Sequence, residues 1–363
     1  MIRELTQPSR RQFLTTVAGA ASAPSIIAAD TTSDKKLGYA LVGLGSLSTN
    51  QIAPALLTTK YSRLAGIVTG TPAKEKTWAD NYGIPEKNIY NYETFDQIAD
   101  NPDIDIVYVV LPNSMHHDYT VRAAKAGKHV LCEKPMATSV AEAEAMIDAC
   151  QKAKRKLAIG YRCQFEPYNL ECKRLAREKE FGDLRMIDAG FGFRSGNPNQ
   201  WRLRHALAGG GALMDVGIYA LQACRYLTGE EPVRISATES KTDPVKFKEV
   251  DETILWNMTF ASGVVATCST TYKFSGVNRF HAFADKGWFG LDPAYSYRGI
   301  KGKTSRGDLK FEDIDQFAAE MDDFSQCILE DKESRVPGEE GLKDMIAIEA
   351  IYKSIRTGTE VSV

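Results

Sequence analysis

The sequence predicts an α/β protein in which a doubly wound parallel sheet is followed by an α+β domain with a large, mostly antiparallel open sheet. Short, nearly uninterrupted apolar runs alternate with helix-patterned segments from Leu37 to about Tyr161, as buried parallel strands and their crossover helices do. A glycine turn, Gly43-Leu44-Gly45, follows directly after the first run. Beyond Tyr161, long strand-like runs are separated only by turn residues, which is typical of antiparallel pairing.

The first half repeats a strand and then a helix. After the run that begins at Leu37, we expect four further strands at Leu64–Val68, Ile104–Leu111, His129–Cys132 and Leu157–Ile159. The helices between them end at glycines or begin with the capping box of Ser139 and Glu142, and they span Ala73–Tyr82, Asp118–Ala126 and residues 139–154. This alternation predicts a parallel sheet with helices on both faces, so ligands are expected at the carboxyl ends of its strands.

The second half begins with a glycine run, Gly209–Gly211, which opens a helix that reaches about Leu227 and ends at Gly229. Asp215 and Tyr219 are four residues apart, so they are expected to share one face of that helix. The remaining elements are four strands and two closing helices, expected at Arg234–Glu239, Thr253–Phe260, Gly263–Thr271, Arg279–Ala284, Ile314–Leu329 and Gly341–Ile355.

The N-terminus predicts an exported protein. Ser-Arg-Arg-Gln-Phe-Leu at residues 9–14 precedes an Ala/Ser/Thr stretch, which is the pattern of a twin-arginine signal peptide. The stretch is too short and too poor in Leu and Ile to span a bilayer core of ~30 Å, so no stable membrane anchor is expected. Because this pathway carries folded proteins, we expect a periplasmic protein that can bring a bound cofactor with it. The expected division is a signal peptide (1–29), a dinucleotide-binding Rossmann domain (36–160) and a substrate domain (161–363) whose last helices pack back on the first.

Composition excludes several classes of protein. A formal net charge of -2 offers no basic surface to nucleic acid. With 43% hydrophobic residues, the chain can bury a substantial core. The seven cysteines contain no Cys-x-x-Cys pair and are expected to be buried thiols. The five histidines have no metal-ligand spacing, so no metal is expected.

The strand ends carry residues expected to bind a dinucleotide. Gly43 and Gly45 let backbone N–H groups approach a pyrophosphate at a helix N-terminus, although Ser48 replaces the third glycine of the usual pattern. The second strand ends at Thr69 without the acidic residue that would bind a ribose 2′-hydroxyl. Thr69 and Lys74 can instead receive a 2′-phosphate, which favours NADP over NAD. The alternative is that Thr69 caps a helix and Lys74 is a solvated charge.

Lys134 stands at the end of another strand and is followed by a proline. A lysine fixed in this way can point into the crevice, lower the pKa of a nearby acid and polarise a hydroxyl. On its own, Glu-Lys-Pro is also a common loop tripeptide.

Six ordered motifs carry a family resemblance: G-L-G, L-P-N-S-x-H, C-E-K-P-M-A-T, G-Y-R-C, Q-W-R-L-R and G-G-G-x-L-M-D-x-G-I-Y. Together they resemble the Gfo/Idh/MocA superfamily over nearly the whole chain, from Leu37 to Val363. Most of that superfamily has a histidine where this chain has Tyr219. The tyrosine indicates the sugar-oxidoreductase branch, with the nearest resemblance to the glucose–fructose oxidoreductases.

The resemblance implies a role for each matched residue. Lys134 and Tyr219 would be the catalytic pair, Asp215 would orient the sugar or the lysine, and Tyr297 would line the sugar pocket. The residues implied in nucleotide binding are Gly43, Gly45, Ser46, Leu47, Thr69, Lys74, Leu111, Asn113, His116, Glu133, Lys134, Arg162, Trp201 and Arg202.

The resemblance also implies a reaction and a cofactor. Tyr219, its pKa lowered by Lys134, would remove the anomeric proton of an aldose while C1 gives hydride to tightly bound NADP, and a lactone would leave. A second sugar, ketose or aldose, would then take the hydride back in a ping-pong cycle. The expected partners are unphosphorylated small sugars and further copies of the chain, as a dimer or tetramer. The alternatives are an aldose dehydrogenase with exchangeable NAD(P), an NAD-dependent glycosidase, and a non-catalytic sugar-binding or sensor protein.

Overall fold

The computed structural model describes residues 35–363, which form one compact unit. The predicted signal peptide, residues 1–29, lies outside the described residues. Two sheets organise the described chain, one of six strands and one of nine. This confirms the predicted α/β class with a parallel sheet followed by a large, mostly antiparallel one. The predicted domain boundary at residues 160 and 161 stays a prediction.

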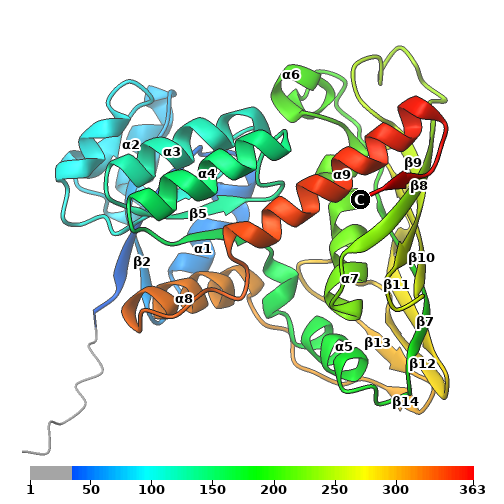
Figure 1. Cartoon of the computed structure of the whole chain (residues 1–363). Coiled ribbons are helices and arrows are strands. Elements are labelled where there is room, and N and C mark those ends of the chain that lie inside the picture. Colours follow the sequence, from blue (N-terminus) through cyan, green and yellow to red (C-terminus); the bar gives the residue numbers. More distant parts are fainter. Residues whose placement is uncertain (1–34) are drawn as a thin grey trace, which may run out of the picture. The chain divides into compact units, whose positions relative to one another are not determined.

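The six-stranded sheet has the order β3-β2-β1-β4-β5-β6, and all of its pairs are parallel. Its central strands are buried apolar runs, as strands covered on both faces must be. Figure 1 shows α3 and α4 side by side over the sheet, and α8 lies against α1 and β2. The strands are β1 (Leu37–Val42), β2 (Ser62–Val68), β3 (Ile89–Tyr90), β4 (Ile106–Val109), β5 (His129–Glu133) and β6 (Leu157–Gly160). The helices are α1 (Ala53–Leu56), α2 (Pro72–Tyr82), α3 (His116–Lys125), α4 (Val140–Lys152) and α8 (Gln316–Leu329).

The nine-stranded sheet has the order β14-β13-β12-β11-β7-β10-β9-β8-β15. All of its pairs are antiparallel except β7 with β10. Helices α5 and α7 lie on one face of this sheet (Figure 1). The strands are β7 (Leu184–Gly192), β8 (Pro232–Ser240), β9 (Thr253–Phe260), β10 (Val265–Thr271), β11 (Val277–Ala284), β12 (Gly287–Leu291), β13 (Gly302–Thr304), β14 (Gly307–Asp308) and β15 (Val361–Ser362). The helices are α5 (Pro167–Arg177), α6 (His205–Ala208), α7 (Ile218–Thr228) and α9 (Gly338–Thr357).

The two closing helices connect the halves of the described chain. The Tyr39 hydroxyl of β1 donates a hydrogen bond to the Met321 carbonyl of α8 at 2.9 Å, and α9 contacts both α4 and β8. Among the described residues, one helical stretch, His205–Thr228, has the length and hydropathy of a membrane span, but 78% of it is buried inside the protein. A core helix has the same composition.

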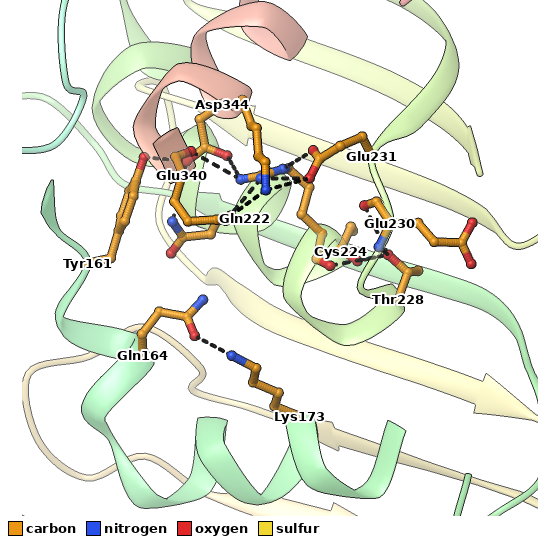
Figure 2. Close-up of polar contacts among 12 residues, drawn as sticks. Tyr161, Gln164, Lys173, Gln222, Cys224, Thr228, Glu230, Glu231, Glu340 and Asp344 are labelled. Atoms are coloured by element: carbon orange, nitrogen blue, oxygen red, sulfur yellow. Dashed lines mark hydrogen bonds and ion pairs between the residues drawn. The ribbon is translucent and has the colours of Figure 1, made fainter. Parts of the chain in front are cut away.

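A buried ion cluster fixes α7 against α9. Arg225, only 3% exposed, lies between the carboxylates of Glu231, Glu340 and Asp344 at 2.5–3.0 Å. Figure 2 shows these three carboxylates gathered around one group of ion pairs. The Tyr161 hydroxyl donates to the other oxygen of Asp344. Because Tyr161 follows β6 directly, this cluster joins the end of the parallel sheet to the helix that carries Tyr219 in its first turn.

Candidate functional site

A cavity of about 730 Å³ opens at the carboxyl ends of the parallel strands and extends to α7. This is where ligands bind in doubly wound folds. Every residue that the sequence singled out lines it: Gly43, Gly45, Ser46, Leu47, Thr69, Lys74, Leu111, Asn113, His116, Glu133, Lys134, Arg162, Trp201, Arg202, Asp215, Tyr219 and Tyr297. The structure therefore brings together residues that lie up to about 250 positions apart in the sequence.

The glycine turn after β1 leaves its backbone open to the cavity. Gly43 has a φ of +94°, and a Cβ there would lie 2.6 Å from the Val110 carbonyl oxygen, so only glycine fits. A Cβ at Gly45 would meet nothing within 4 Å, which is the open approach that a pyrophosphate needs. Ser48 is buried, and its hydroxyl donates to the Gly43 carbonyl at 2.6 Å. The serine thus closes the turn where a third glycine was expected.

Thr69 follows the end of β2, Lys74 lies in the first turn of α2, and both face the glycine turn. The Lys74 Nζ donates to the Leu44 carbonyl oxygen at 2.7 Å, so this lysine is not a freely solvated charge. The Thr69 hydroxyl accepts from the Thr71 amide at 3.2 Å and does not cap α2. Among residues 35–363, the carboxylates that line the cavity are Glu133 and Asp215, and neither lies at the end of β2.

Asn113 and His116 tie the cavity's loops together. The Asn113 amide donates to the Ala208 carbonyl of α6 at 2.8 Å. The His116 ring lies between two carbonyl oxygens, with Nδ1 2.9 Å from that of Pro135 and Nε2 2.9 Å from that of Leu111. Burial lowers the pKa of His116. Its ring nitrogens are engaged by the backbone, so His116 holds the loops after β4 and β5 in place.

Lys134, Asp215 and Tyr219 meet in the cavity. Lys134 Nζ donates to the main-chain carbonyl of Asp215 at 2.6 Å, lies 3.5 Å from its Oδ1 and lies 5.0 Å from the centre of the Tyr219 ring. Asp215 also contacts Arg202 Nε at 3.2 Å and accepts from the Tyr272 hydroxyl at 2.8 Å. Burial would raise the pKa of Asp215, but Arg202 and Lys134 outweigh it and hold that pKa below its usual value.

The expectation that Lys134 lowers the pKa of Tyr219 is wrong. Burial raises the pKa of Tyr219 above its usual value, and the main cation that opposes this shift is Arg162, through its charge. Lys134 faces the flat side of the Tyr219 ring. Tyr219 is therefore a neutral phenol at neutral pH, suited to hold and donate a proton.

Arg162 faces the second sheet's side of the cavity. Its guanidinium donates to Gln316 Oε1 and to the Tyr295 carbonyl, each at 2.5 Å. It also stacks 5.0 Å from the centre of the Tyr219 ring and 4.6 Å from that of Tyr297. In this position Arg162 supports the aromatic wall, and it donates its hydrogen bonds to carbonyl oxygens of the protein.

The glycine run at Gly209–Gly211 has a packing function that the sequence did not reveal. The Asp251 carboxylate accepts from the Gly211 amide at 2.6 Å and from the Leu213 amide at 2.8 Å. A Cβ at Gly211 would lie 2.1 Å from the Asp251 carbonyl oxygen. Asp251 thereby positions the π-helical turn η7 (Leu213–Gly217), which carries Asp215. No local signal indicates this pair, because the residues are 40 positions apart.

The remaining wall is aromatic. Phe191, Phe193, Trp201 and Tyr297 line the cavity beside Tyr219. Arg202 lies 4.5 Å from the centre of the Trp201 ring, and Phe191 meets Tyr219 edge to face at 5.5 Å. Rings of this kind exclude water and pack against the apolar faces of ligands.

Comparisons with known proteins agree with this architecture. Residues 37–161 match the oxidoreductase family with an NAD-binding Rossmann fold, residues 169–290 match the GFO/IDH/MocA C-terminal domain, and residues 311–363 match the C-terminal alpha/beta domain of the same oxidoreductases. The structure of aldose–aldose oxidoreductase from Caulobacter crescentus, complexed with glycerol, is 50% identical, covers 91% of this chain and 100% of its own, and superimposes with a TM-score of 0.88.

Two archaeal enzymes are more distant relatives. The NADP-dependent D-xylose 1-dehydrogenase of Haloarcula marismortui is 29% identical over 91% of this chain and 94% of its own length. The D-xylose 1-dehydrogenase (NADP(+)) 2 of Haloferax volcanii is 27% identical over 89% of this chain and 98% of its own. The open glycine turn, the Thr69–Lys74 corner and the cavity volume fit a nicotinamide nucleotide. The chain belongs to the Gfo/Idh/MocA family and is an oxidoreductase that uses a pyridine nucleotide.

Proposed function

We propose that the protein is a sugar oxidoreductase that oxidises an aldose to its lactone and reduces a second sugar, with NADP retained between the two half-reactions. The observation that carries the proposal is the meeting of Lys134, Asp215 and Tyr219 in one cavity with the open glycine turn. A sugar oxidoreductase is also the activity that the xylose dehydrogenases and the aldose–aldose oxidoreductase support.

The residues divide the chemistry between them. A nicotinamide nucleotide, when bound, supplies the hydride acceptor and donor. Tyr219, neutral at neutral pH, donates its hydroxyl proton to the carbonyl oxygen of the sugar that is reduced. The phenolate that this step leaves then takes the anomeric hydroxyl proton of the sugar that is oxidised, which restores the neutral tyrosine. Lys134, held by Asp215, provides a positive charge and hydrogen-bond donors for that oxygen.

The choice of NADP and its retention rest on separate observations. A 2′-phosphate is favoured by Lys74, which donates to the glycine turn, and by Thr69 near it. Within residues 35–363, no carboxylate lines the cavity at the end of β2 to compete for that place. The signal peptide expected at residues 1–29 favours retention, because a periplasmic enzyme needs a cycle that consumes no free nucleotide. Dimer or tetramer formation stays a prediction.

A conventional aldose dehydrogenase with exchangeable NADP is the second candidate, because both archaeal relatives are dehydrogenases. Desalted protein distinguishes the two. Retained NADP should appear on acid extraction, an aldose alone should reduce it once, and a second sugar should reoxidise it and restore turnover. A requirement for added NADP in every turnover would establish the dehydrogenase.

Export has its own test. Replacing both Arg10 and Arg11 by Lys should keep the full-length protein in the cytoplasm, whereas the unchanged chain should be recovered from the periplasm. Equal distribution of the two chains would contradict twin-arginine export.

A further inference from the structure

Two buried carboxyl groups meet directly beneath the catalytic cavity. Glu133 ends β5, Glu320 lies on α8, and the hydroxyl of Tyr108 on β4 lies between them, 2.8 Å from Glu133 Oε1 and 3.1 Å from Glu320 Oε1. All three residues are at most 6% exposed. Helix α8 lies far along the chain from the motifs that define the site, and none of those motifs includes Glu320.

A proton count limits the charge of this group. The Tyr108 hydroxyl has one proton and can donate to one carboxyl only. The other carboxyl must donate to the Tyr108 oxygen, and only a protonated carboxyl can do so. Burial and the neighbouring carboxylate both oppose a second charge at Glu320. At least one carboxyl is therefore protonated, and the pair carries at most one negative charge.

The negative charge of this carboxyl pair interacts with the guanidinium of Arg162. Burial raises the pKa of both carboxyls, and the positive charge of Arg162 opposes the rise at each of them. Within residues 35–363, five buried side-chain polar atoms have no hydrogen-bond partner, and two of these are Glu320 Oε2 and Arg162 Nε. These two atoms make no hydrogen bond, so Arg162 acts on the two carboxyls through its charge.

The group is coupled to the catalytic side chains through Glu133. Its Oε2 accepts from the Lys134 amide at 3.3 Å. Its Oε1 would lie 3.0 Å from a Cβ at Gly160, so the carboxyl fills the space beside the end of β6. Burial raises the pKa of Tyr219, Arg162 opposes this rise, and Glu133 adds to it.

We propose that Glu133 and Glu320 share one proton through the Tyr108 hydroxyl, and that Glu320 is a positioning residue that keeps one negative charge beside Arg162 and Lys134. The role in catalysis rests on the proposed function, whereas the shared proton does not. The other titratable or charged groups that face the two carboxyls are Tyr39, Cys132, Lys134, Arg162, Cys163, Tyr219, Tyr297 and Asp323.

Infrared spectroscopy of the whole protein tests the shared proton without any assay of activity. At about pH 8 the other raised carboxyl, Asp344, whose pKa burial raises to about 6, is ionised. The spectrum should then show the carbonyl stretch of a protonated, buried carboxyl. Glu133→Gln and Glu320→Gln should each abolish it, because the remaining carboxyl no longer competes for a charge. Asp344→Asn should leave it unchanged. A wild-type spectrum without this band would overturn the proposal.

The pH dependence of single-turnover sugar oxidation tests the charge. Each single variant keeps one negative charge, so the pH at which the rate rises with the ionisation of Tyr219 should hardly change. The double variant loses that charge and leaves Arg162 unopposed, so this rise should move to a lower pH by roughly one unit. If both carboxyls were ionised, each single variant would shift the pH of this rise, and the two shifts would add in the double variant. If both were protonated, no variant would shift it. Either result contradicts the proposal, and so does a change in rate with no shift in pH, which a purely structural role would give.

Discussion

Replacing Tyr219 with phenylalanine should remove catalysis and leave the protein's structure intact. The ring keeps its contacts, because Phe191 and Tyr295 lie 5.5 Å and 5.6 Å from its centre and Lys134 faces its flat side. The variant loses one hydroxyl beside Arg162. Even a full hydrogen bond contributes only about 0.5–1.5 kcal/mol to the free energy of unfolding, so the variant should remain folded and retain its nucleotide.

The effect on the chemical step should be much larger. A general acid–base group contributes roughly 10²–10⁴-fold to the rate, which corresponds to about 3–5 kcal/mol in the activation barrier. Single-turnover reduction of the bound nucleotide by an aldose, followed by its absorbance, measures this step alone. Since burial raises the pKa of Tyr219, the wild-type rate should keep rising with pH beyond 10, the ordinary pKa of tyrosine.

Tyr295→Phe is the matched control. The Tyr295 ring packs against that of Tyr219 at a tilt of 43°, and its buried hydroxyl has no hydrogen-bond partner among the described residues. Removing that hydroxyl should therefore change neither the rate nor the stability by more than a small amount. Near-normal hydride transfer in Tyr219→Phe, or an equal loss in the control, would refute the assignment of Tyr219 as the proton donor.

Three further predictions follow from named contacts. Lys74→Met should weaken NADP binding roughly 10- to 100-fold, the value of one charge-assisted hydrogen bond, and leave NAD binding unchanged in equilibrium titrations. Asp251→Ala leaves two buried amides without an acceptor and should lower the free energy of unfolding by about 2–4 kcal/mol, whereas Asp251→Asn, which keeps one acceptor oxygen, should cost less. Burial raises the folded-state pKa of Asp344 to about 6, so folding favours its protonated form. The free energy of unfolding should therefore fall as pH rises from about 4 through 6. Asp344→Asn should lack that fall.

The sequence predicts best what depends on local patterns. The carboxyl ends of parallel strands lie at one sheet edge by geometry, so Gly43, Thr69 and Lys134 could be placed in one cavity from their positions after apolar runs. The stops at Gly83 and Gly229 are confirmed, since both have positive φ at the ends of their helices. Each of these predictions required only residues that are close together in the chain.

Features that depend on distant contacts were missed. Strand β7 has no clean alternation, because Gly190 and Gly192 accommodate the side chains of Ser269 and Thr271 on the adjacent strand. The charge environment of Tyr219 was predicted wrongly. The sequence motif pointed to Lys134, whereas Arg162 is the cation that most strongly lowers the pKa of Tyr219 against the effect of burial. A pKa depends on burial and on every nearby charge, and neither can be obtained from spacing.

Two π-helical turns, η1 (Ser48–Ile52) and η7 (Leu213–Gly217), face the cavity. In η7, one group holds Lys134 in position and another balances its charge. A π turn is wider than an α turn and recurs at functional sites. In η7 it presents the main-chain carbonyl of Asp215 to Lys134 at 2.6 Å, shorter than the 3.5 Å to the carboxylate. The backbone therefore holds the lysine in place. The carboxylate of Asp215 is left to balance Lys134 and Arg202, with Tyr272 fixing its orientation. A lysine anchored by a neutral carbonyl keeps its position when the charge in the cavity changes, as the proposed cycle of two sugars on one nucleotide requires.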